Sequence, residues 1–207
     1  MNVIHATARS QKTQARRDRK REAILDAAAA ILGRGEELTM KSLARECDLS
    51  VGAAYRYFPG KQALLTGLQI RAVQALEAHL ELNIAGARDP LARIEAAAGT
   101  WASFGAAHPT LFRLVDSSLS DPDRQLSDEE AASVEVALSP VLTRIAGLFD
   151  DAVDAGLLVP GDSEMRTHAL WAALHGVGHF RKRRTPPNGE DLERELVRAI
   201  LAGWRKP

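Results

Sequence analysis

A short stretch near the amino end concentrates the side chains that could bind an anionic partner. Small residues are followed there by two tyrosines and two cations, in the order Gly52, Ala53, Ala54, Tyr55, Arg56, Tyr57 and Lys61. Small residues let a backbone approach a flat surface closely, while hydroxyl groups and cations hold phosphates. These residue types fit a helix that enters the major groove of DNA. An ordinary helical hairpin with a polar face would show the same spacing.

Two short helices joined by a tight turn must position these side chains. The first has an inward face at i, i+1 and i+4, made of Leu43, Ala44 and Cys47. We expect Thr39 to cap its start and Ser50 to cap the second helix, over 51–57. Pro59 ends that helix, because the residue before a proline is pushed out of the α region.

The segment 38–65 resembles the DNA-binding domain of the TetR family of transcriptional regulators. The matching residues are Leu43-Ala44, Leu49-Ser50-Val51-Gly52, Tyr55-Arg56-Tyr57-Phe58 and Lys61-Gln62-Ala63-Leu64. With the helix in front of it, the resemblance covers residues 16 to about 68, a third of the chain.

The resemblance implies a role for each position of the hairpin. It places Thr39, Tyr55, Tyr57 and Lys61 on phosphates, and it places Lys41, Val51, Gly52, Ala53 and Arg56 at base edges. Ala53 stands where the family often has Thr or Ser, so a base contact there would be apolar. Ala54 stands where the family often has Leu, which leaves the packing behind it less defined.

Composition favours an all-α protein, since alanine, leucine and arginine are plentiful and β-branched and aromatic residues are scarce. Apolar periodicity and helix caps predict about nine helices. We expect a disordered basic arm over 1–15, a three-helix DNA-binding head over 16–62, and a helical effector-binding and dimerisation body over 63–207. A long helix, from about 60 to 85, would join the two. Cys47 is the only cysteine, which excludes an intramolecular disulfide and fits a reducing compartment.

The net charge of zero hides a division along the chain. Residues 1–61 hold 12 Lys and Arg against 7 Asp and Glu, and the remainder holds 15 against 20. A basic amino-terminal third on an acidic body is typical of a nucleic-acid-binding head. The crowded cations between Arg9 and Arg21 fit either a solvated tail or an arm along the phosphate backbone or in the minor groove. A membrane surface could attract them too, but no matching apolar face accompanies them.

The last two helices carry small residues beside larger apolar ones: Ala169, Ala172, Gly176, Ala199 and Gly203. Such faces pack closely within the body or against a second copy. Because one helix-turn-helix makes a small footprint, we expect a homodimer formed through residues 162–184 and 189–204. Four cations, Arg181 to Arg184, complement the negative end of their helix or form a second phosphate patch.

The body resembles the WHG type of TetR carboxy-terminal domain, through Trp171, His175 and Gly176 with His108-Pro109 upstream. Family members bind small inducers among these helices. Candidate ligand-binding residues are Trp101, Phe104, Phe112, Phe149, Trp171 and His175, with ordinary core packing as the alternative. His168, His175 and His179 share one helical stripe, but no carboxylate or cysteine joins them, so we predict no metal site and no cofactor.

Catalytic motifs are lacking: the sequence has no phosphate-binding glycine loop, no nucleophile elbow and no cysteine positioned with a histidine. We found no apolar run near the roughly 20 residues that span a bilayer, so we expect a cytoplasmic protein. The sequence therefore predicts a repressor, not an enzyme, that binds a palindromic operator in double-stranded DNA as a homodimer and is released by a small molecule. The alternatives are a regulator without an effector and, more remotely, a helical enzyme.

Overall fold

The computed structural model describes residues 2–120, 127–181 and 189–206. Over these ranges the chain folds into nine helices, which confirms the predicted all-α class. Their bounds are α1 Asn2–Gly33, α2 Met40–Glu46, α3 Val51–Tyr57, α4 Lys61–Ala85, α5 Pro90–Ala107, α6 Pro109–Ser120, α7 Asp128–Asp154, α8 Ser163–Arg181 and α9 Gly189–Trp204.

Side-chain caps fix most of the helix starts where the sequence placed them. Thr39 and Ser42 form a capping box on α2, each hydroxyl oxygen accepting the other residue's amide at 2.9 Å. Ser127 and Glu130 form the same device at the start of α7. The side chains of Ser50, Asp89 and Asp162 cap α3, α5 and α8. Each cap satisfies amides that the first turn leaves unpaired.

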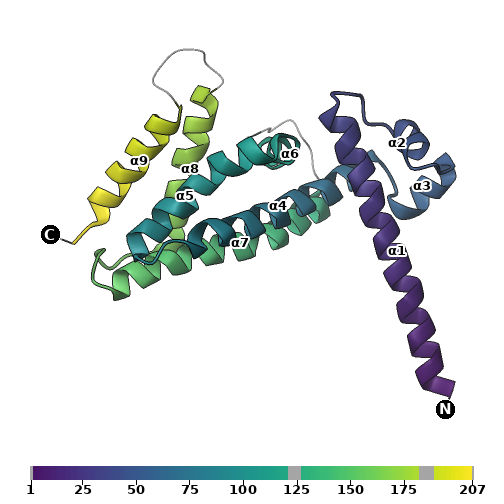
Figure 1. Ribbon diagram of the computed structural model, residues 1–207, viewed down its shortest axis with the longest axis horizontal. Coiled ribbons are helices and arrows are strands. Elements are labelled where there is room, and N and C mark those ends of the chain that lie inside the picture. Colours follow the sequence, from purple (N-terminus) through teal and green to yellow (C-terminus); the bar gives the residue numbers. More distant parts are fainter. Residues whose placement is uncertain (1, 121–126, 182–188, 207) are drawn as a thin grey trace.

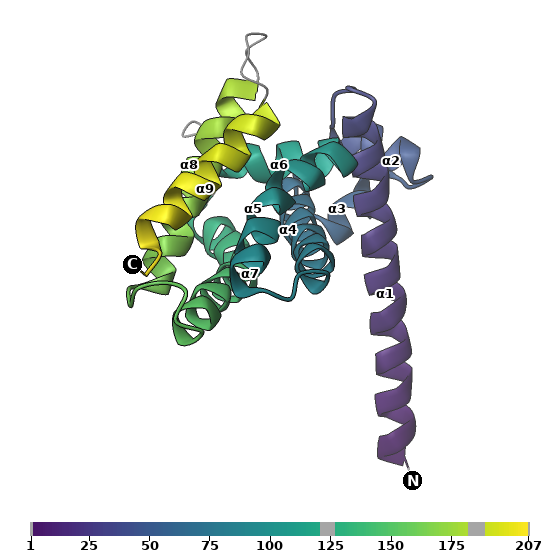
Figure 2. The same ribbon diagram turned by 60° about the vertical axis from the view of Figure 1, so that its left-hand side comes forward.

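Helix α4 connects the two ends of the molecule (Figures 1 and 2). Its first turns pack against α1, and the rest packs against α5, α6 and α7. Its core face carries Leu64, Leu68, Ala72, Leu76 and Leu80, each at most 5% exposed. The buried residues of head and body belong to one continuous apolar cluster. The apolar core is thus continuous from the head to the body along α4.

Helix α1 begins much earlier than the sequence predicted. We expected residues 1–15 to lack regular structure, yet the helix runs from Asn2. Residues 2–32 contain neither glycine nor proline and are rich in good helix formers. Apolar periodicity gave no signal there, and in the part of this segment whose side chains the structure describes, residues 11–19 are all exposed.

Helix α7 is long and apolar enough, by length and composition alone, to cross a membrane. One 18-residue window reaches a mean hydropathy of 1.4, and 28% of that window is buried. The expectation that no apolar run approaches this length was therefore wrong. One such helix is weak evidence of a membrane span, because core helices meet the same criterion. Here α7 packs against α4, α5 and α8.

Candidate nucleic-acid interface and body cavity

The turn between α2 and α3 sets the angle of the second helix. Asp48 adopts a positive φ of 53°, a conformation that aspartate tolerates better than most residues because its short polar side chain bonds locally. The amide of Leu49 donates to the carbonyl oxygen of Ala44 at 2.8 Å, which closes the turn. Helix α3 then starts at Val51, as predicted.

Helix α3 divides its residues between the core and the surface. Val51 is 43% and Tyr55 47% exposed, and Arg56 is also exposed. Gly52 faces open space, since a Cβ built there would have no neighbour within 4 Å. The outer face thus presents a small residue between an aliphatic, an aromatic and a cationic side chain. This surface can follow the edges of bases in a groove.

The other predicted contacts lie around this face with different exposure. Lys41 and Lys61 are exposed, whereas Thr39 and Tyr57 are half-buried. The Thr39 hydroxyl is engaged with Ser42 in the α2 cap. Ala53, which we expected at a base edge, is only 9% exposed and contributes to the core side of α3. Ala54 is 1% exposed, so the small residue there packs fully.

Arg21 holds the far end of α3 in place. Its guanidinium group donates to the carbonyl oxygen of Tyr57 at 2.9 Å and lies 4.0 Å from the centre of the Phe58 ring. A cation at the last carbonyls of a helix also complements the negative end of the helix dipole. Phe58 itself is fully buried, and Gly67 on α4 approaches its ring closely. The sequence showed Arg21 only as one of the crowded cations of a tail or arm and gave no sign of this contact.

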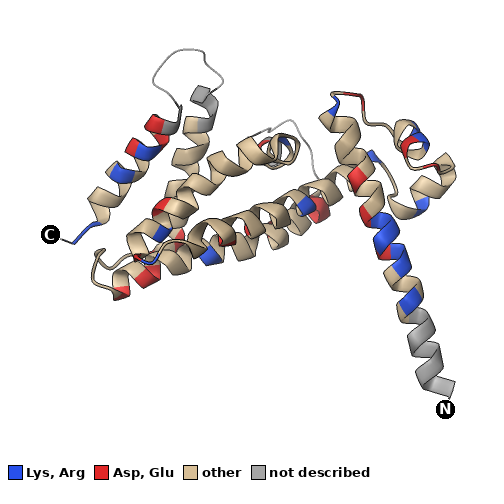
Figure 3. Cartoon of the chain, in the orientation of Figure 1, with Lys and Arg blue, Asp and Glu red and all other residues tan. Residues whose placement is uncertain are grey.

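An ion-pair network lies at the outer end of the head. Arg34 donates to Glu36 at 2.6 Å and to Glu46 at 3.0 Å, and so ties the end of α1 to α2. The hydrogen bond from Arg34 lowers the pKa of Glu36, and its carboxylate partners raise the pKa of Arg34. The side chains of Arg34 and Glu36 both face solvent, so water screens the contribution of their ion pair to stability. Over the head as a whole, Figure 3 shows most of the Lys and Arg residues along α1.

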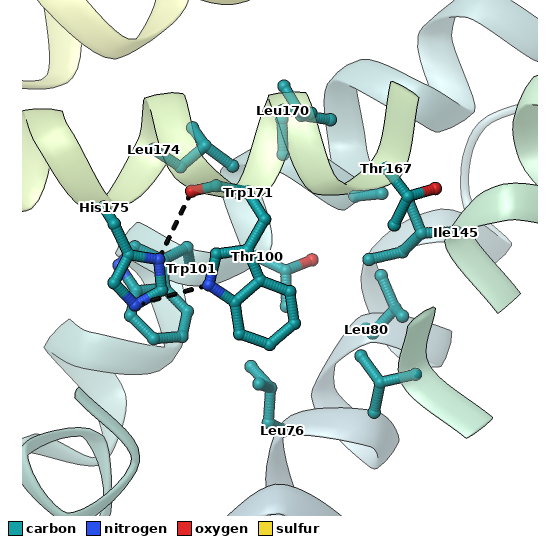
Figure 4. Close-up of a pocket in the computed structure, with 13 residues that line it drawn as sticks. Leu76, Leu80, Thr100, Trp101, Ile145, Thr167, Leu170, Trp171, Leu174 and His175 are labelled. Carbon is teal, nitrogen blue, oxygen red and sulfur yellow. Dashed lines mark hydrogen bonds between the residues drawn. The ribbon is translucent and has the colours of Figure 1, made fainter. Parts of the chain in front are cut away.

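The body contains an apolar cavity of about 50 Å³ between α4, α5, α7 and α8 (Figure 4). Three of the six predicted ligand residues line it: Trp101, Trp171 and His175. Leu76 and Leu80 from α4 and Val141 and Ile145 from α7 form much of the remaining wall. Their helical periodicity alone does not distinguish a cavity wall from filled packing.

The three phenylalanines lie outside the wall of this cavity. Phe104 and Phe149 are fully buried, and Phe149 packs edge-on against Trp204 with ring centroids 5.6 Å apart. Phe112 packs behind Trp101 at 4.7 Å. None of the three lines the cavity, and Phe112 supports its wall through Trp101.

The histidines of α8 make local contacts. His175 lies 4.5 Å from the Trp101 ring and accepts a hydrogen bond of 3.4 Å from the Trp171 indole. The Nδ1 atom of His168 lies 2.8 Å from the carbonyl oxygen of Glu164. The side chain of His179 is outside the described part, as are those of Arg181 to Arg184. Among the described side chains, no three His, Cys, Asp or Glu residues gather to hold a metal ion.

A larger recess of about 440 Å³ separates α5 from α9. Its rim carries both acids and cations, Glu95, Glu193, Arg194 and Arg198, above small residues of α5. This mixture of signs selects no single charge on a ligand.

A helix-turn-helix head on an all-helical body defines this protein as a helix-turn-helix regulator. The family model described as bacterial regulatory proteins, tetR family, matches residues 24–68. The model described as tetracyclin repressor-like, C-terminal domain, matches residues 94–202, which is more than half of the chain. The chain therefore belongs to the TetR family.

Two relatives with assigned roles resemble part of the chain. The HTH-type transcriptional repressor KstR of Mycobacterium tuberculosis is 34% identical over 84 residues, which is 40% of this chain and 38% of that repressor. KstR of Rhodococcus jostii is 36% identical over 78 residues, which is 37% of this chain and 36% of that repressor. The matches thus span less than half the length of either relative.

Solved structures share the fold over nearly the whole chain. A protein of unknown function from Rhodococcus sp. RHA1 aligns with 24% identity and a TM-score of 0.75, covering 90% of this chain and 96% of that one. AibR, in complex with isovaleryl coenzyme A and operator DNA, aligns with 18% identity and a TM-score of 0.66, covering 88% and 98%. At these identities the likeness establishes the common architecture.

Proposed function

We propose that this protein is a DNA-binding transcriptional repressor. The exposed outer face of α3, held at its end by Arg21, is the observation that carries the proposal. In this proposal Thr39, Tyr55, Tyr57 and Lys61 contact phosphates, and Lys41, Val51, Gly52 and Arg56 face base edges. The burial of Ala53 argues against a substantial base contact from its methyl group. The head comprises residues 16–62 and the body residues 63–207.

The repressor would bind a palindromic operator as a homodimer. The small residues that we expected at the interface are all exposed on α8 and α9: Ala169, Ala172, Gly176, Ala199 and Gly203. Met165, 65% exposed, continues the same surface. Two copies packed through α8 and α9 would bury this surface in a four-helix bundle, with 162–181 and 189–204 as the described part. Such a dimer presents two α3 helices to successive major grooves.

A small apolar molecule would release the repressor from DNA. The cavity walls are almost entirely apolar, with His175, Thr100 and Thr167 as polar exceptions. Its 50 Å³ is far below the roughly 300–1,000 Å³ of drug-sized ligand sites, so binding must widen it. AibR, a structural relative, was crystallised with isovaleryl coenzyme A and operator DNA, so this fold accommodates both kinds of partner.

Widening of the cavity would reach the head by two routes. Leu76 and Leu80 line the cavity from α4, whose first turns pack against α1. Helix α6 also contacts α1, where Thr110 lies 3.4 Å from a Cβ built on Gly33. Suppose that the DNA-binding conformation outnumbers the released conformation 99:1 without effector. To reverse that ratio, the effector must bind the released conformation more tightly by about 5.5 kcal/mol.

The second candidate is a regulator whose body only dimerises. The small size of the cavity favours it, because a nearly filled body has little room for an effector. We further propose that the protein is cytoplasmic and has no enzymatic activity, in keeping with its family of transcriptional regulators.

Selection of bound duplexes from a random pool by the purified full chain tests the proposal. We expect enrichment of a palindrome, a dimer in sedimentation, and loss of enrichment when the cognate apolar metabolite is added. Enrichment that no metabolite reverses would support the second candidate. A monomer that prefers no duplex to heparin would contradict both.

A further inference from the structure

The face of α1 that packs on the head continues past the head as a row of cations. Ile24, Leu25 and Ala28 are buried, at 1%, 3% and 0% exposure. One turn earlier on the same face stand Lys20 and Arg21, and one turn before those stands Arg17. The face of α1 that turns toward the head is thus apolar from Ile24 onward and cationic from Arg17 to Arg21.

Two contacts show where this row lies relative to the helix-turn-helix. Arg21 reaches Tyr57 and Phe58 at the end of α3. Lys20 is half-buried near α2, close enough for its charge to lower the pKa of the Cys47 thiol against the opposing effect of burial. Arg17 stands one turn, or about 6 Å along the helix axis, before Arg21 on the same face of α1. Figures 1 and 2 both show the amino-terminal half of α1 extending away from the rest of the molecule.

Arg17 is fully available to a partner. Its side chain is exposed, and neither Arg17 nor Lys20 takes part in any ion pair that the described ranges contain. The nearest acid along the helix, Asp18, accepts a hydrogen bond from Gln14. A duplex carries one negative charge per roughly 1.7 Å of axis, which is the dense linear charge that such a row complements.

We propose that Arg17 and Lys20 form a second phosphate-binding surface, which contacts the DNA backbone beside the recognition helix α3 at the edge of the half-site. This inference rests on the proposed DNA-binding function. The sequence left these cations open between a solvated tail and an arm on DNA, and the continuous helix α1 gives them a fixed position relative to α3. The surface adds affinity without sequence preference, because phosphates carry no base information.

Arg17 and Arg19 provide a matched test within one turn of helix. Both are exposed arginines, but they lie roughly 200° apart around the helix axis, so Arg19 faces away from the head. Glutamine keeps the helix propensity of either position. We would compare Arg17→Gln and Arg19→Gln with the wild type, using the duplex that the wild type selects from a random pool.

For Arg17→Gln we expect weaker binding and a shallower salt dependence. Each phosphate contact contributes about 0.9 to the slope of log affinity against log salt, so two copies in a dimer lower the slope by about 1.8. Between 50 and 200 mM salt, the ratio of wild-type affinity to Arg17→Gln affinity should then fall about twelvefold. Arg19→Gln should keep nearly the wild-type slope, and Lys20→Gln should behave like Arg17→Gln.

The inference and the proposed function fail in different ways. A wild type that binds no duplex specifically would overturn the proposed function itself. Specific binding by the wild type with equal slopes for Arg17→Gln and Arg19→Gln would overturn only the second phosphate surface. Circular dichroism of each variant excludes loss of helix as the cause of a changed slope.

Discussion

The imidazole of His175 lies parallel to the indole of Trp171, with the ring centroids 5.6 Å apart and the planes inclined by 10°. The Trp171 Nε1 also donates to the His175 Nε2 at 3.4 Å, and the Trp101 ring packs against the imidazole with centroids 4.5 Å apart. Two of the three residues that give the WHG type its name therefore act together at the cavity. This arrangement assigns His175 to packing and hydrogen bonding.

Replacing His175 with alanine should destabilise the body. The substitution leaves the Trp171 indole N–H without its partner and removes an aromatic contact, which we expect to cost about 1–3 kcal/mol in the free energy of unfolding measured in urea. His168→Ala is the matched control, because that exposed side chain bonds only to a carbonyl of its own helix. Equal costs for the two variants would argue against the stacked arrangement.

Gln69 is an unusual residue to find at 1% exposure on the core face of α4. Within the part of the chain that the structure describes, neither its amide nitrogen nor its carbonyl oxygen has a hydrogen-bond partner. Methionine has a similar length and no polar group to leave unpaired, so Gln69→Met should raise the unfolding free energy by about 1–2 kcal/mol. Gln74→Met, on the exposed side of the same helix, should change it by less than about 0.5 kcal/mol. A loss of stability in Gln69→Met would show that the amide finds a partner in solution.

Two glycines within helices should respond to alanine in opposite directions. A Cβ on Gly67 would lie 3.1 Å from the Phe58 ring and 3.3 Å from Leu25, and both neighbours are buried. A Cβ on Gly99 of α5 would meet nothing within 4 Å. Gly99→Ala should therefore gain about 0.5–1 kcal/mol from helix propensity, whereas crowding should offset that gain in Gly67→Ala and weaken the head. Thermal unfolding measures both changes, and a clear gain for Gly67→Ala would contradict the close packing of α1, α3 and α4.

Cys47 allows a chemical test of packing in the head, because it is the only thiol in the sequence. Burial raises its pKa, so the folded thiol holds its proton more tightly than the unfolded one. Its contribution to stability is present below the unfolded pKa and is lost as the pH rises through the raised folded value. At pH 8 the native thiol should react more slowly with a disulfide reagent than the thiol in urea. Equal rates would place Cys47 at the surface.

Local signals in the sequence predicted the framework well. Thr39 and Ser50 cap helices as expected, because a cap depends on residues only three apart. Helix α3 has the predicted bounds for the same reason. Arg21 was counted among the cations of a solvated tail or a DNA-binding arm, since its partners Tyr57 and Phe58 lie 36 or more residues away. Long-range pairs of this kind leave no local pattern.

The cavity was only half predictable. Trp101, Trp171 and His175 line it as expected, while Phe104, Phe112 and Phe149 do not. Helical periodicity identifies the inward face of each helix, but it does not reveal which inward side chains meet across a gap. That outcome depends on the axial offset between α4, α5, α7 and α8, which only the folded arrangement fixes.

The exposed cations and hydroxyls of the head should separate into two kinds in binding experiments. Tyr55→Phe and Lys61→Ala should weaken binding to all duplexes alike, because both side chains are expected on phosphates. Arg56→Ala should instead change the preferred sequence, with about 1–3 kcal/mol of discrimination lost at one base pair of each half-site. Affinities for the selected duplex and its single-base variants measure both effects. Arg113→Ala, on the exposed side of α6 in the body, should leave affinity and preference unchanged. If Arg56→Ala lost affinity equally for every duplex, Arg56 would belong with the phosphate contacts, and base reading would rest on Lys41 and the amino end of α3.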